Sequence, residues 1–194
     1  EKLIPQYSKS PDEDLYYFFG SLQEVAGRVR DYNTGIDCTN KRLALLPKLA
    51  NGDTLSYNNV DNYIMLSQLY YEAGMEDKAQ MAIELAEREC ASIKNMPDLE
   101  VKELFACLYQ AKGRVSDSYD VSLQAYAKAL NLFEQLEQSF LNQIKPEMDT
   151  SKSIANIKSD QIFAKSMVQN MQDHIATVLI NRGMLNHNKG KYHL

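Results

Sequence analysis

The stretch that decides the fold class is residues 63–86, which read YIMLSQLYYEAGMEDKAQMAIELA. Its apolar and small residues recur three and four positions apart, which is the spacing of one face of an α-helix. Gly74 interrupts this pattern, and glycine often follows a helix because it adopts positive φ without strain. The stretch therefore predicts two helices joined by a tight turn.

Helical spacing also covers most of the remaining chain, and no segment shows the strict alternation of a half-buried strand. The breaks between segments are short, which favours consecutive antiparallel helices and an all-α fold. Residues 51–59 are expected to form a polar loop, and Gly113 is expected to end a helix. The expected helices cover residues 12–30, which carry an apolar stripe from Leu15 to Val29, and 36–49, 61–73, 76–93, 98–112, 117–144 and 151–188.

The pattern of residues 63–86 recurs along the chain. Its small residues would let two helices approach closely, while its large residues would fill the space between them. The first copy consists of Tyr63, Leu66, Ser67, Tyr70, Gly74, Ala79, Ile83 and Ala86. The second consists of Phe105, Ala106, Tyr109, Gly113, Ser122, Tyr126 and Ala129, with about one extra helical turn around residues 114–118. Weaker traces are Leu179, Arg182, Gly183 and Asn186, and also Asp31, Gly35 and Thr39.

These copies resemble the tetratricopeptide repeat, in which an aromatic residue, Leu with a small neighbour, Tyr, a turn and Ala-x-x-x-aromatic-x-x-Ala follow one another. The resemblance implies a tetratricopeptide-like α-solenoid of antiparallel helix pairs, with a generic helical bundle as the alternative. This chain departs from the family in having Tyr63, Ser67 and Ile83 where Trp, Gly and an aromatic are usual. Ala79 and Ser122 lie 43 residues apart, more than the usual repeat of about 34, so longer helices are expected.

The expected organisation is a single helical repeat domain over residues 1–194. Residues 1–50 would form a degenerate helix pair, 61–93 a repeat, 98–144 a repeat with an insertion, and 151–194 a long helix with a truncated half repeat. The chain opens with Glu1 rather than Met, so we expect it to be processed or cut from a longer protein.

Composition and motifs give no support for catalysis or for nucleic-acid binding. The net charge of −5 disfavours nucleic acid and anionic membranes as partners, and no apolar run approaches the roughly 20 residues of a membrane span. His174, His187 and His193 lack metal-site spacing, and no phosphate-binding or nucleophile motif occurs. Cys38, Cys90 and Cys107 are expected to be reduced and unpaired. We therefore expect a protein that is not an enzyme and has no cofactor or metal.

The resemblance implies that the first helix of each repeat lines a concave groove for a protein or peptide. The family's clamp for a chaperone's C-terminal carboxylate is absent, because Ile64, Gln68, Leu104 and Asn181 stand at its positions. Acidic residues with apolar and aromatic inserts would favour a basic or amphipathic ligand. The predicted groove residues are Asp61, Ile64, Gln68, Tyr71, Glu72, Glu100, Glu103, Cys107, Gln110, Ile180, Met184 and His187.

The sequence thus predicts a noncatalytic protein–protein interaction module that binds a peptide or partner helix. The alternative is a ligand- or peptide-sensing input domain of a larger bacterial signalling or transcriptional regulator. A third interpretation is a homo-oligomer formed through the long helix over residues 151–188. A cytoplasmic location is expected, with the bacterial periplasm as the alternative.

Overall fold

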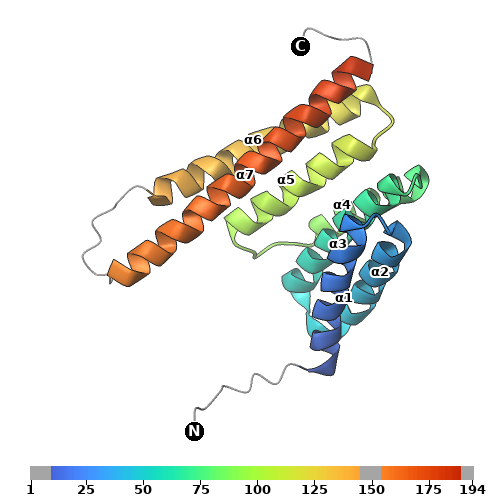
Figure 1. Ribbon diagram of the computed structural model, residues 1–194, viewed down its shortest axis with the longest axis horizontal. Coiled ribbons are helices and arrows are strands. Elements are labelled where there is room, and N and C mark those ends of the chain that lie inside the picture. Colours follow the sequence, from blue (N-terminus) through green and yellow to red (C-terminus); the bar gives the residue numbers. More distant parts are fainter. Residues whose placement is uncertain (1–9, 145–153, 189–194) are drawn as a thin grey trace. The chain divides into compact units, whose positions relative to one another are not determined.

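The computed structural model describes the backbone of residues 10–144 and 154–188, and every regular element in these ranges is an α-helix. This confirms the predicted all-α fold class for the described residues. The chain divides into two compact units, Glu1–Met96 and Pro97–Leu194. The first unit holds α1 (Pro11–Arg28), α2 (Tyr32–Leu49), α3 (Gly52–Glu72) and α4 (Glu76–Cys90), and the second holds α5 (Asp98–Val115), α6 (Tyr119–Ile144) and α7 (Ile154–Asn188) (Figure 1).

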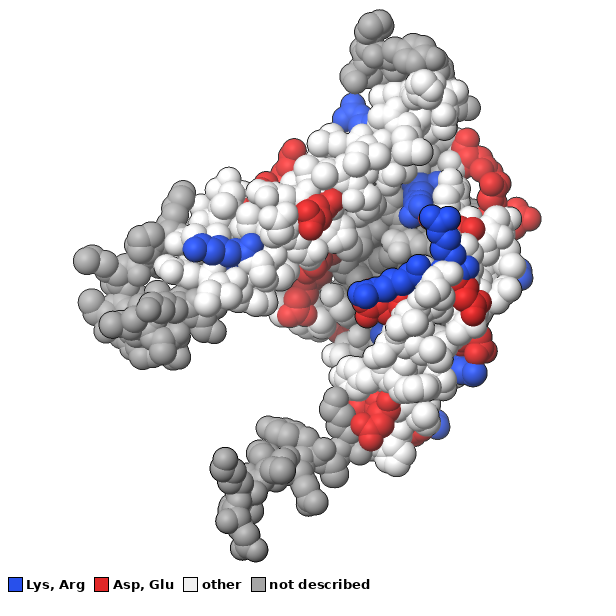
Figure 2. Space-filling view, in the orientation of Figure 1, with Lys and Arg blue, Asp and Glu red and all other residues white. Residues whose placement is uncertain are grey.

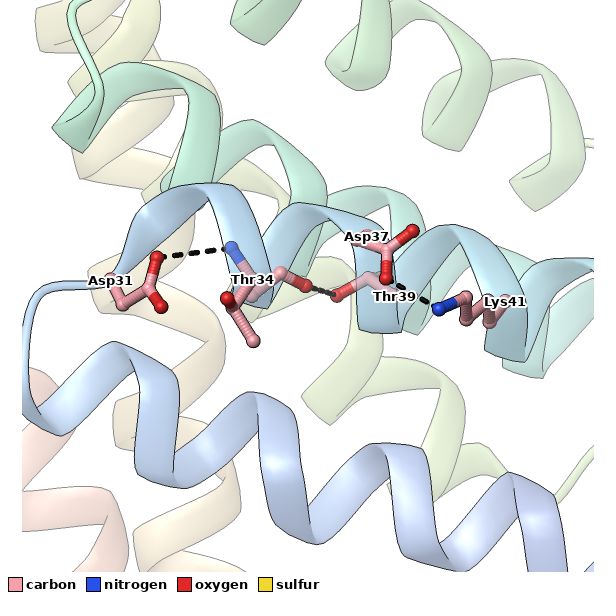
Figure 3. Close-up of polar contacts among 6 residues, drawn as sticks. Asp31, Thr34, Asp37, Thr39 and Lys41 are labelled. Carbon is pink, nitrogen blue, oxygen red and sulfur yellow. Dashed lines mark hydrogen bonds and ion pairs between the residues drawn. The ribbon is translucent and has the colours of Figure 1, made fainter.

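Local sequence signals set the helix ends of the first unit. Ser10 caps α1 by accepting a hydrogen bond from the Glu13 N–H at 3.2 Å. Asp31 caps α2 in the same way, because its Oδ1 accepts from the Thr34 N–H at 3.2 Å (Figure 3). Gly74, between α3 and α4, has a φ of 73°, the conformation predicted for it.

Consecutive helices pack against each other in both units: α1 on α2, α2 on α3, and α3 on α4 in the first, and α5 on α6 and α6 on α7 in the second. Ala79 and Ala86 of α4 are both 0% exposed, which agrees with their predicted place in the packing of this helix pair. The core of the second unit centres on Tyr126, Phe133 and Met171, which lie on α6 and α7.

Three helices bury the same positions when they are counted from the residue that precedes each of them. These preceding residues are Asp31 for α2, Met75 for α4 and Ser118 for α6. In all three helices, the residue four positions after this preceding residue is small. Its N–H donates to the carbonyl of the preceding residue at 2.9–3.0 Å. The residues four, eight and fifteen positions after the preceding residue are buried in all three helices. They are Gly35, Thr39 and Leu46 in α2, Ala79, Ile83 and Cys90 in α4, and Ser122, Tyr126 and Phe133 in α6.

The structure corrects three sequence predictions. The helix expected from residue 36 begins earlier, because α2 starts at Tyr32 and Gly35 lies inside it. The polar loop expected at residues 51–59 is wrong, because α3 begins at Gly52 and includes Asn58 and Asn59. Burial of Val60 at 0% exposure illustrates how packing outweighs the low helix propensity of asparagine.

Gly113 was also expected to end a helix, but α5 continues through it to Val115, and Gly113 is buried inside α5. Three residues separate α3 from α4, and three separate α5 from α6. The predicted one-turn insertion therefore lengthens α5 rather than the connection after it.

Candidate interaction surfaces

The predicted groove residues of α3 differ widely in their exposure. Asp61 and Glu72 are exposed, and Gln68 and Tyr71 are partly exposed. Ile64, in contrast, is only 5% exposed and belongs to the core of the first unit. Little of the Ile64 side chain is therefore accessible to a partner, and Tyr71 is the large partly accessible side chain among these predicted residues.

Asp61 lies in a protein environment that changes its ionisation. Surrounding protein atoms displace water and raise the pKa of Asp61, while the positive charge of Arg42 acts in the opposite direction. Asp61 therefore lies close to a cation of its own unit, Arg42. Glu72 is the last residue of α3.

Arg42 belongs to a polar network that joins the first three helices. Its guanidinium donates to Gln23 Oε1 at 3.0 Å and to the Tyr16 hydroxyl at 2.9 Å, and it lies 4.5 Å from the centroid of the Tyr16 ring. Asn62 of α3 donates to the same hydroxyl at 3.4 Å and to the Asn58 carbonyl at 2.7 Å. Sequence reasoning missed this network. The available signal was Arg42 itself. It lies eleven residues after Asp31, and the corresponding positions in α4 and α6 hold small residues, Ala86 and Ala129.

The predicted groove face of α5 is accessible mainly near the start of the helix. Glu100 is exposed, whereas Glu103, Cys107 and Gln110 are partly buried. Gln110 Oε1 lies 3.1 Å from His174 Nδ1 of α7, so the far end of this face contacts α7. The His174 ring stacks on Phe133 at 4.7 Å, and its burial lowers the pKa of His174, which favours the neutral imidazole.

Near its C-terminal end, α7 presents an apolar face to solvent. Ile180 and Met184 are 62% and 59% exposed, and His187, one further turn along, is also exposed. Figure 2 shows that the visible side of α7 is mostly uncharged. The same helical end is fixed to α6, because the Tyr119 hydroxyl donates to Asn186 Oδ1 at 2.8 Å.

The predicted groove draws on α3 of the first unit and on α5 and α7 of the second. The structure thus supplies one face on α3 and a second on α5 and α7, each within its own unit. A single groove that joins both faces stays a prediction.

The described residues contain no group of three His, Cys, Asp or Glu side chains placed to hold a metal ion. His193 lies outside the described residues. Cys38 and Cys90 are buried free thiols, and Cys107 is partly buried. Burial raises the pKa of the Cys38 thiol, and it raises the pKa of Cys90 to about 11, so both favour the unreactive neutral form.

Within the part of the chain that the structure describes, no helix is both long and apolar enough to span a membrane. Comparison of the sequence with protein-family models and with curated proteins, and of the fold with solved structures, finds no match.

Proposed function

We propose that this protein is a noncatalytic interaction module of the tetratricopeptide-like class, which binds a basic or amphipathic peptide or helix. The observation that carries the proposal is the shared burial register of α2, α4 and α6. Three helices that bury corresponding positions support a repeated helix-pair unit, and stacked units of this kind commonly provide extended binding surfaces.

In such a repeat, α3 and α5 are first helices and α4 and α6 are second helices. The second helices direct Ala79, Ile83, Ser122 and Tyr126 into the packing of each pair. The first helices retain exposed carboxylates at Asp61, Glu72 and Glu100. These first-helix faces are therefore the best candidates for contact with a partner.

The charge of these faces favours a basic ligand. Glu72 and Glu100 are exposed acids at opposite ends of their helices, and the whole chain carries a net charge of −5. Asp98, two residues before Glu100, forms an ion pair with Lys102 at 2.6 Å. Tyr71 on α3 and Ile180 and Met184 on α7 offer apolar contacts that a purely charged surface lacks. A ligand with both basic and apolar side chains would use both features.

The test is binding of a fluorescent amphipathic helical peptide made of Lys and Leu, followed by anisotropy at low and moderate salt. Reversing two first-helix charges, Glu72→Lys with Glu100→Lys, should weaken binding about tenfold or more, equivalent to about 1.4 kcal/mol. The matched control is Glu84→Lys with Glu134→Lys, which makes the same charge change at exposed sites on the second helices α4 and α6.

The control variant should bind with most of the original affinity. Equal losses in both variants would show that only net charge matters and would contradict the assignment of the first-helix faces. A peptide in which Glu replaces Lys should bind much more weakly to the unmodified protein. Failure of the basic peptide to bind at all would contradict the proposed ligand class.

A further inference from the structure

Helix α1 carries a continuous stripe of large apolar side chains on its solvent-facing side. Leu15, Phe18, Leu22, Val25 and Val29, the last just after the helix end, are between 36% and 69% exposed. They are spaced alternately three and four residues apart, which is the a/d spacing of a helix that pairs with another helix. The buried residues of α1, Gln23 and Ala26, lie outside the stripe: Ala26 borders it, and Gln23 lies farther round the helix.

This stripe, defined by Leu15, Phe18, Leu22, Val25 and Val29, differs from the apolar surface of α7. On α7, Ile162 and Phe163 are separated by several turns from Leu179, Ile180 and Met184. On α1 the five residues follow one another without a gap over the whole helix. Contiguous exposed apolar patches of this kind on folded proteins mark interaction sites.

The charges beside the stripe indicate what covers it. Asp12, Glu13 and Asp14 lie in the first turn of α1, whereas Arg28 lies in its last turn, where it forms an ion pair with Glu24 of the same helix at 2.6 Å. Both side chains of this pair are largely exposed, so the pair contributes little and leaves the Arg28 guanidinium accessible to an acid on a second helix. Asp14 and Arg28 each precede a stripe residue by one position, so both flank the same side of the stripe. Ser21 is midway between them and is small. A helix with one acidic end and one basic end is complementary to itself only in the antiparallel orientation.

We propose that α1 pairs antiparallel with α1 of a second copy of this chain, around a two-fold axis near the middle of the helix. In the a/d register that is centred on the middle of the helix, Leu15 lies opposite Val25 of the second copy and Phe18 opposite Leu22 of the second copy. The same register places Asp14 beside Arg28 of the second copy, and the reverse pair follows by symmetry. A parallel arrangement would instead bring the acidic ends together. This surface is separate from the proposed peptide-binding faces and does not rest on them.

Sedimentation equilibrium over a range of micromolar concentrations tests the pairing. The unmodified chain should approach twice its monomer mass of 22.1 kDa as concentration rises. The variant Phe18→Glu with Val25→Glu should raise the dimer dissociation constant at least a hundredfold. The control, Met81→Glu with Val121→Glu, makes the same change at two exposed apolar residues outside the stripe and should leave the dissociation constant within about threefold. Circular dichroism checks that both variants remain helical.

A charge swap tests the antiparallel register. Asp14→Arg and Arg28→Asp should each weaken dimerisation several-fold, because each places like charges opposite one another, and the combined variant should restore most of the affinity. A monomeric unmodified chain at all concentrations would overturn the proposal. So would a control as disruptive as the stripe variant, or a combined variant no better than its two parents.

Discussion

Gly113 should be one of the least replaceable residues of the second unit. A Cβ atom at this position would lie 2.7 Å from Cδ1 and Cε1 of Tyr126 and 3.0 Å from its Cγ. These contacts are shorter than van der Waals contact, and the Tyr126 ring is only 3% exposed, so it has little room to move. Gly113→Ala must therefore shift α5, α6 or the ring itself.

Two opposing effects set the size of the change. Replacing glycine by alanine inside a helix stabilises by about 1 kcal/mol, whereas overpacking a well-filled core costs about 1–3 kcal/mol. Because three ring carbons clash at once, we place the overpacking near the upper end of its range, about 2–3 kcal/mol. The net loss in the free energy of unfolding should then be about 1–2 kcal/mol. For a chain of this length, this corresponds to a fall of about 3 °C in melting temperature per kcal/mol.

Thermal melting followed by circular dichroism measures the effect, with Gly183→Ala as the matched control. Gly183 also lies inside a helix of the second unit, but a Cβ there would meet nothing within 4 Å. The control should melt at or slightly above the temperature of the unmodified protein. In a Tyr126→Leu background, the cost of Gly113→Ala should shrink. A Gly113→Ala protein that melts as high as the Gly183→Ala protein would refute the packing argument.

Three further predictions concern single residues of the first unit. Ala79→Leu should lower the free energy of unfolding in urea by about 1–3 kcal/mol because Ala79 is 0% exposed, and an unchanged midpoint would contradict the repeat alignment. Burial raises the pKa of the Cys90 thiol from 9.0 to about 11. The contribution of the neutral Cys90 thiol to the free energy of unfolding is therefore complete below pH 9 and is lost as the pH rises toward 11. Urea midpoints across this pH range should fall less steeply in Cys90→Ala than in the unmodified protein. Identical slopes would show that Cys90 does not cause the loss of stability. Asp31→Ala should lower the melting temperature because it removes the α2 cap, whereas Asp31→Asn, which can still accept from Thr34, should retain most of it.

Helix type and helix order could be predicted from the sequence because both depend on local patterns. The turn at Gly74 and the burial of Ala79, Ile83 and Ala86 agree with the predictions made from residues 63–86. The failures at residues 51–59 and at Gly113 share one cause. Asparagine and glycine are weak helix formers, and only the packing of neighbouring helices shows that they lie within one. The sequence alone gives no sign that the ring of Tyr126 occupies the space beside Gly113.

The candidate surfaces were less predictable than the fold. Glu72 and Glu100 are exposed as expected, but Ile64 is buried and Gln110 contacts His174 of α7. A one-dimensional pattern places residues on a face of a helix, but it does not show how far the next helix covers that face. The same limit applies to α1, where the sequence revealed the apolar stripe but not its exposure to solvent.

The exposure of that stripe follows from how α1 and α2 meet. In α4 and α6, Ala86 and Ala129 are both 0% exposed. In α2 the corresponding residue is Arg42, whose side chain occupies the space beside Gly20 and bonds to Gln23 and Tyr16. The contacts between α1 and α2 include a polar network of Tyr16, Gln23 and Arg42, and Lys41 lies 5.3 Å from the centroid of the Phe19 ring. The stripe residues on α1, in contrast, keep at least 36% of their surface exposed. Because hydrogen bonds and the stacked arginine hold the contact between α1 and α2, the stripe on α1 can remain exposed for pairing with a second helix.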